Sequence, residues 1–339
     1  MISWELKKIF KAKIGLIIIA LFIFLSGIMF LIKPTLETEN SYRDENYRLV
    51  IDTRPKQEIA QEKYNNKIIQ MKQIADVSEN DEVVNNFSNK VKEQLKNIKY
   101  EEYKDVDFYK VMDYKVDYPL MSAIIIIILI LIFSNIYTDE KISGVDNIIL
   151  SSKNKLKALY SKVALAVTLP IVLYSIYLLV TFIITMVQYG LPVNGELGVF
   201  RISDMGFLFN KAYTINEYLL LKIMTMTGVF ISISVAACFF SLISSTSLAS
   251  ISAVLIFMGL GRVCTLMKFL PYPLLSILTK GNYEELILYP DRFIGMYAGE
   301  ISILGRDFGV INVCNVVLIA TIFTGILFSV LAIKKKLNR

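Results

Sequence analysis

The residues best suited to a specific chemical task lie in segment 138–162, TDEKISGVDNIILSSKNKLKALYSK. Val145, Ile148 and Ile149 recur there at i, i+3 and i+4, the spacing of one face of a short helix. A loop that only joins two neighbouring segments needs a few polar residues, and its apolar residues have no reason to align. The pattern therefore predicts a short amphipathic helix whose apolar side chains dock in a groove on a soluble partner.

Residues on both sides of this helix complete the docking pattern. Gly144 supplies a flexible break before it, and Ser151 and Ser152 end it. Lys155 and Lys157 follow at the start of the next helical stretch.

The composition excludes most catalytic chemistry in this chain. Because there is no histidine, a catalytic histidine, a histidine metal site and a thiol–imidazole pair are all excluded. No Gly-x-x-x-x-Gly-Lys-[Ser/Thr] phosphate loop is present either. We predict a non-catalytic chain with no cofactor of its own. If ATP drives the protein, another polypeptide must bind the nucleotide and its magnesium.

Few ionisable residues fall within the apolar segments, which argues against a membrane enzyme. Glu217, Lys222 and Arg262 lie toward segment ends, where snorkelling to the interface would explain them. Cys264 and Cys314 lie near the ends of adjacent segments. A disulfide between them is geometrically conceivable, although a free cysteine usually behaves as a small buried hydrophobe.

The elements that must position the docking helix are apolar and long. Of the 339 residues, 55% are hydrophobic and only 19% are charged, which indicates a membrane protein. A spanning helix needs roughly 20 mostly apolar residues. Six stretches qualify: 14–32, 119–137, 163–187, 217–243, 248–266 and 310–333. The sequence predicts an all-α polytopic membrane protein with six transmembrane helices.

The basic residues indicate how the chain is oriented. They concentrate in an amphipathic helix at 1–13, in the segment 138–162 and in the tail 334–339, which share one side if there are six spans. Short basic segments mark the cytoplasmic face, so both termini are predicted to be cytoplasmic in a multi-pass protein of the plasma membrane. The net charge of +6 is thus explained by topology and by contact with anionic lipid, and not by nucleic-acid binding.

The segments on the opposite side are predicted to be extracellular. Within 33–118, two sets of apolar residues recur at helical spacing and predict a helical hairpin inserted between the first and second spans. The sets are Ala60, Tyr64, Ile68, Met71 and Ala75, and Val84, Phe87, Val91, Leu95 and Ile98. A loop at 188–216 and a segment with short helices at 267–309 complete this side. The hairpin has three open roles: cargo handling, capping of the exit, or dimerisation.

The chain resembles the permeases of ABC-2 type transporters. The resemblance rests on Glu140, Gly144, the triplet Ile148-Ile149-Leu150, Ser151-Ser152, Lys155, Lys157 and Lys162, which are similar to the family signature E...G....LLSSP..R......K after the second span. The amphipathic start, six spans and outer insertions extend the resemblance over essentially the whole chain.

The resemblance implies an ABC transporter in which segment 138–162 holds the coupling helix. Glu140 and Gly144 would shape the end of the second span, and Ile148 and Ile149 would fill a groove on a cytoplasmic ATPase dimer. Lys155 or Lys157 would contact acidic groups on that partner, since a charged rim contributes specificity more than affinity. A second permease copy, identical or different, would complete the assembly. Its activity would be export of a peptide, an antibiotic or a lipid-like compound.

Two alternatives remain open at this point. The chain could be a membrane sensor or scaffold whose hairpin binds a ligand and signals through segment 138–162. The serines between 232 and 252 either pack helices closely or line a substrate pathway.

Overall fold

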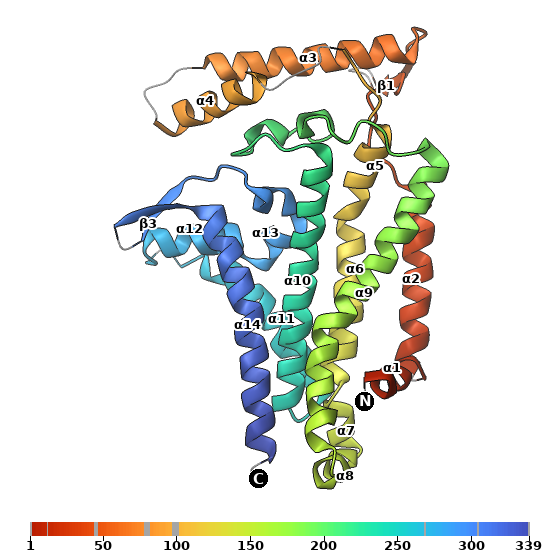
Figure 1. The fold of residues 1–339 in the computed structure, drawn as a ribbon, viewed down its shortest axis with the longest axis vertical. Helices are drawn as coiled ribbons and strands as arrows, with labels where there is room; N and C mark the ends of the chain where they lie inside the picture. Colours follow the sequence, from red (N-terminus) through yellow and green to blue (C-terminus); the bar gives the residue numbers. More distant parts are fainter. Residues whose placement is uncertain are drawn as a thin grey trace.

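A bundle of long apolar helices forms the body of the protein (Figure 1). The computed structural model describes residues 2–11, 13–43, 47–77, 82–96, 102–267, 269–303 and 305–337. The long helices are α2 (Lys13–Leu31), α6 (Pro119–Asn135), α9 (Lys155–Tyr189), α10 (Ile215–Ile243), α11 (Ser247–Cys264) and α14 (Val310–Leu337). Each of the six predicted spans falls on one of them.

The chain is a multi-pass membrane protein by helix length and hydropathy. In the described residues, five helical runs are long and apolar enough to cross a membrane. A sixth crossing results if α1 (Ile2–Lys11) and α2, which meet at a bend of 77°, are counted together. The second run, Asp107–Ile142, includes α5 (Asp107–Val116), α6 and α7 (Thr138–Ile142). The predicted second span covers only its apolar middle.

Helix α10 lies at the centre of the bundle and packs against α6, α9 and α14. The Tyr174 ring of α9 meets the Phe230 ring of α10 edge-on, with centroids 5.2 Å apart. Ser234 of α10 donates a hydrogen bond to the carbonyl oxygen of Ala166 of α9 over 2.6 Å. Small polar residues let helices approach closely in this way, so these contacts support the packing interpretation of the serine-rich region.

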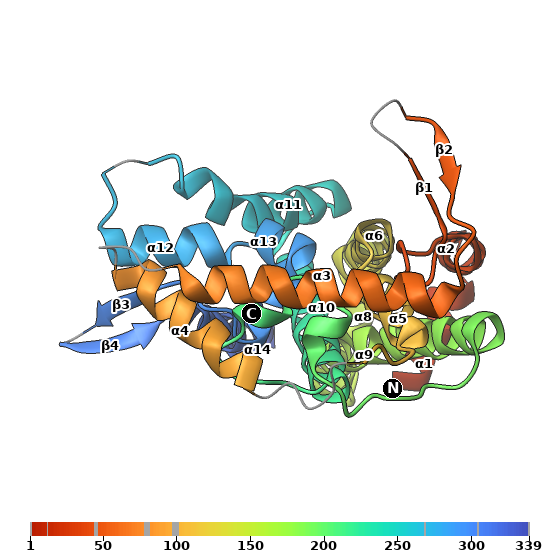
Figure 2. The ribbon, with the colours of Figure 1, turned by 90° about the horizontal axis from the view of Figure 1, so that it is seen from above.

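The predicted helical hairpin is present as α3 (Lys56–Asp76) and α4 (Glu82–Lys96). Tyr64 and Met71 of α3 and Val91 of α4 form a small core with Phe200. Val84, Phe87 and Ile98 lie outside the residues whose side chains are described. The hairpin lies crosswise over one end of the bundle, and α3 extends across most of the width of the protein when seen from above (Figures 1 and 2).

Short elements complete the α3–α4 end of the bundle. They are the 3-10 helices η1 (Val199–Arg201), η2 (Gly206–Leu208) and η3 (Pro290–Ile294), and the helices α12 (Tyr272–Gly281) and α13 (Tyr283–Leu288). Helix α12 packs on α11 and α14. Two antiparallel hairpins were not expected from the sequence: β1 (Ser41–Arg43) with β2 (Leu49–Ile51), and β3 (Glu300–Ile303) with β4 (Arg306–Gly309). Their strands are three or four residues long, too short for a clear alternating pattern.

The opposite end of the bundle carries both termini together with α1, α7 and α8 (Val145–Ser151) (Figure 1). We call it the α8 end. The three basic segments therefore lie at one end, as the predicted topology requires. All three cysteines are free thiols, so no disulfide joins Cys264 and Cys314.

Candidate functional site

A left-handed glycine separates α7 from α8. Gly144 has a φ of 70° and is the residue that precedes α8. A Cβ added there would meet nothing within 4 Å, so the backbone conformation, and not crowding, favours glycine. Ser151 and Ser152 close the helix by donating hydrogen bonds to the carbonyl oxygens of Ile148 and Ile149 over 3.0 and 2.8 Å. The predicted short helix and both of its breaks are thus present.

The apolar residues around α8 are exposed. Ile142, Val145 and Ile148 have exposed fractions of 63%, 37% and 68%. Ile149 and Leu150 are half-buried, and Leu150 packs against the core of the bundle. Val145 and Ile148 are three residues apart on α8 and therefore lie on one face of it, and Ile142 ends α7 just before the Gly144 turn. We call these three exposed apolar residues the α8 patch. Contiguous exposed apolar residues of this kind mark interaction sites.

Basic and hydroxyl side chains border the α8 patch. Ser151, Ser152 and Lys157 are exposed, and Lys155 is half-buried in the first turn of α9. The structure therefore places Val145 to Ser152 on one short helix and both lysines at the start of the next. This arrangement presents an apolar centre with a polar border.

Glu140 lies apart from the α8 patch, in a buried ion network. Its Oε1 accepts hydrogen bonds from Lys162 Nζ over 2.7 Å and from Lys8 Nζ over 2.9 Å. Lys162 Nζ also contacts Glu5 Oε1 over 2.7 Å. The side chains of Glu5, Glu140 and Lys162 are at most 3% exposed. Glu140 thus fixes α7 against α1 and α9 and does not reach the surface that a partner would touch.

Helix α7 is also tied to the turn between α10 and α11. Ser241 Oγ accepts hydrogen bonds from the backbone nitrogens of Tyr137 and Thr138 over 3.0 and 3.2 Å. Lys141 Nζ donates to the carbonyl oxygen of Ser244 over 3.1 Å. Thr138 Oγ1 lies 3.0 Å from Ser247 Oγ. Helix α7, which immediately precedes α8, is therefore bonded directly to α10 and to the α10–α11 turn.

A second buried lysine lies toward the other end of the bundle, where snorkelling was predicted. That prediction is wrong, because the Lys222 side chain is only 2% exposed and is held by three carboxylates. Its Nζ lies 2.7 Å from Asp113 Oδ1, 3.1 Å from Asp117 Oδ2 and 2.9 Å from Asp291 Oδ1. The network fastens α10 to the α5–α6 junction and to η3. Within the described ranges, no group of histidine, cysteine or acidic side chains is arranged to hold a metal ion.

Sequence reasoning missed both ion networks because their members are far apart in the chain. Lys222 and Asp113 are separated by 109 residues, and Lys162 and Glu5 by 157. A local signal did exist at Lys162, which follows the docking helix at the edge of an apolar span where a charge needs a partner. Its partners are not evident from a local pattern.

Comparisons of the chain with protein-family models, with curated proteins and with solved structures give no match.

Proposed function

We propose that this chain is the membrane subunit of an ATP-driven exporter and that α8 is the coupling helix on which a separate ATPase subunit docks. The observation that carries the proposal is the α8 patch: Ile142, Val145 and Ile148 are exposed beyond the spans. The resemblance of segment 138–162 to ABC-2 type permeases supports the same assignment. Lys155 and Lys157 would then face acidic groups on the ATPase.

The contacts of α7 supply a route for mechanical force. Helix α8 follows α7 directly, and α7 is bonded to α1 and α9 through Glu140, to α10 through Ser241 and to the α10–α11 turn through Lys141. A push or pull on α8 would therefore move several spans together. Such rigid-body motion of packed helices is a common form of switching transition.

The proposed assembly contains two permease chains and two ATPases. ATP and magnesium would be bound in the ATPases, whose closure would draw the two coupling helices together. The α8 end would face the cytoplasm, because short basic segments gather there. The membrane would then be the plasma membrane, and the cargo a peptide, an antibiotic or a lipid-like compound.

The test is a paired charge substitution at the α8 end. Ile148→Asp places a carboxylate in the proposed groove, whereas Asn154→Asp adds the same charge at an exposed loop position and leaves the α8 patch intact. We expect Ile148→Asp to weaken ATPase association about 10- to 100-fold, because a buried unpaired charge is costly. Asn154→Asp should have little effect. Equal association of both variants, or purification without an ATPase, would contradict the proposal.

A further inference from the structure

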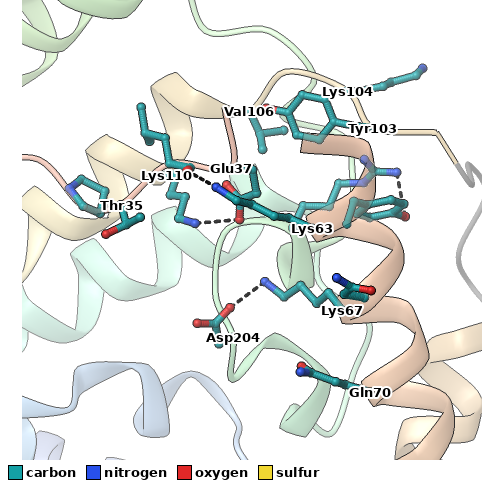
Figure 3. A pocket seen from close by; sticks show the side chains of 15 residues that line it. Thr35, Glu37, Lys63, Lys67, Gln70, Tyr103, Lys104, Val106, Lys110 and Asp204 are labelled. Atoms are coloured by element: carbon teal, nitrogen blue, oxygen red, sulfur yellow. Dashed lines mark hydrogen bonds and ion pairs between the residues drawn. The ribbon is translucent and has the colours of Figure 1, made fainter. Parts of the chain in front are cut away.

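A basic cavity lies between α3 and the bundle, away from the α8 patch (Figure 3). It measures about 570 Å³ and is bounded by α3, the loop at 34–37, the start of α5 and the segment from η1 to η2. Cavities of roughly 300–1,000 Å³ hold small organic ligands. The space is thus large enough for a small solute or for the headgroup of a lipid.

Positive charge dominates the lining of this cavity. The cationic residues are Lys63, Lys67, Lys104, Lys110 and Arg201, and the carboxylates are Glu37 and Asp204. These lining residues carry three more positive than negative charges, and the carboxylate of Asp107 lies next to them, 3.4 Å from the Tyr103 hydroxyl. The tyrosines Tyr64 and Tyr103 add aromatic surface and hydroxyl groups.

Two of the cationic side chains are held in place by ion pairs with other elements. Lys67 Nζ of α3 lies 2.7 Å from Asp204 Oδ1, and Lys110 Nζ of α5 lies 2.6 Å from Glu37 Oε1 (Figure 3). Lys67 and Lys110 are only 15% and 18% exposed. Side chains that are already ordered lose less conformational entropy when a ligand binds.

Arg201 forms the most buried part of the wall. It is 4% exposed, its guanidinium lies 4.3 Å from the centroid of the Tyr64 ring, and it donates a hydrogen bond to the Tyr64 hydroxyl over 3.0 Å. Burial lowers the pKa of Arg201 from its usual value, and the neighbouring tyrosines oppose this shift. An arginine buried in the wall adds to the positive potential of the cavity, and its charge is little screened by water.

Of the two carboxylates that line the cavity, Asp204 is the more exposed. Its side chain is 90% exposed, whereas its partner Lys67 is largely covered. The hydrogen bond from Lys67 and the positive charges of Lys67 and Lys110 lower the pKa of Asp204 below its usual value. Asp204 is therefore a carboxylate at neutral pH. It competes with any anion for Lys67.

We propose that this cavity binds a phosphate-bearing group, either on a free solute or on a lipid headgroup. A lining in which cationic side chains outnumber carboxylates five to two suits a group with two or more negative charges better than a single carboxylate. Lysine ammonium groups are donors suited to phosphate oxygens. This site goes beyond the proposed function and does not depend on it, since binding here requires neither an ATPase nor transport.

The experiment is calorimetric titration of the full-length protein in nanodiscs of zwitterionic lipid at low salt. The two probes are inorganic pyrophosphate and dihexanoyl phosphatidic acid. Saturable binding of either probe is expected. Tighter binding of pyrophosphate would identify a free solute as the source of the phosphate, and tighter binding of phosphatidic acid would identify a lipid.

Three variants locate the binding. Lys67→Gln should weaken it about tenfold, the loss of one charge-assisted contact. Lys72→Gln removes an exposed lysine of the same helix that does not line the cavity, and it should leave binding unchanged. Asp204→Asn removes the competing carboxylate and should tighten binding several-fold, an effect that a damaged fold would not produce. Absence of saturable binding by both probes, equal effects at Lys67 and Lys72, or weaker binding by Asp204→Asn would overturn the proposal.

Discussion

Lys162 Nζ of α9 lies 2.7 Å from Glu140 Oε1 of α7, and neither side chain is more than 2% exposed. These residues are 22 positions apart, on opposite sides of α8 in the sequence. The pair therefore closes the loop that carries the α8 patch. It holds both ends of that loop at a fixed separation, so that α8 moves with α7 and α9.

Lys162→Met should strongly destabilise the protein. The substitution leaves Glu5 and Glu140 facing each other in a buried site with only Lys8 as a counter-charge. Removal of one partner from a buried ion pair costs about 3–5 kcal/mol. Thermal denaturation in detergent would measure the loss, with Lys153→Met, at an exposed loop position, as the control. Adding Glu5→Gln and Glu140→Gln to Lys162→Met removes the two unpaired carboxylates and should restore part of the stability. A triple variant no more stable than Lys162→Met would refute this explanation.

Lys222→Met should have a comparable effect at the other end of the bundle. Three aspartates would lose their shared cation, and again about 3–5 kcal/mol is expected. Conversion of Asp113, Asp117 and Asp291 to asparagine in the same protein should restore part of the stability. The check is the thermal midpoint of each variant, with Lys56→Met at an exposed site as the control. If Lys222→Met were as stable as Lys56→Met, the Lys222 side chain would have to reach solvent, which contradicts the buried network.

Much of the fold follows from local sequence patterns, whereas the ion networks do not. The run PLMSAIIIIILILIFSNIY predicts α6 because an uncharged stretch of that length is stable only in a bilayer. The spacing of Val145 and Ile148 likewise predicts α8. Lys222 resembles a snorkelling residue from its position alone, and only the tertiary fold brings Asp291 to it. Charge pairing across 109 residues has no local signature.

Gly144→Val should reduce coupling more than Gly144→Asn does. Gly144 has a φ of 70°, a conformation that costs an ordinary residue about 1–2 kcal/mol and asparagine less. An added Cβ would meet nothing within 4 Å, so the backbone conformation is the main source of the effect. The measurement is ATP turnover by the reconstituted complex. Equal turnover in both variants would mean that the turn before α8 does not need its left-handed residue.

Ser241→Ala should destabilise the junction between α6 and α7. The substitution leaves the backbone nitrogens of Tyr137 and Thr138 without their shared acceptor, at a cost of about 1–3 kcal/mol for an unsatisfied buried group. Ser252→Ala, at an exposed position of α11, is the matched control. Hydrogen exchange of the two amides should accelerate in Ser241→Ala only. Unchanged protection would show that another group supports this junction.

The central claim is that the α8 patch receives an ATPase subunit, and site-specific photo-crosslinking from position 148 tests it most directly. A photoreactive residue is placed at Ile148, with position 252 on α11 as the control, and the cells are irradiated. We expect one crosslinked product that contains a polypeptide with a phosphate-binding loop, formed from position 148 only. Crosslinking of position 148 to lipid alone would contradict this claim. Labelling of an Ile148→Cys variant by an impermeant thiol reagent added outside intact cells would contradict it as well.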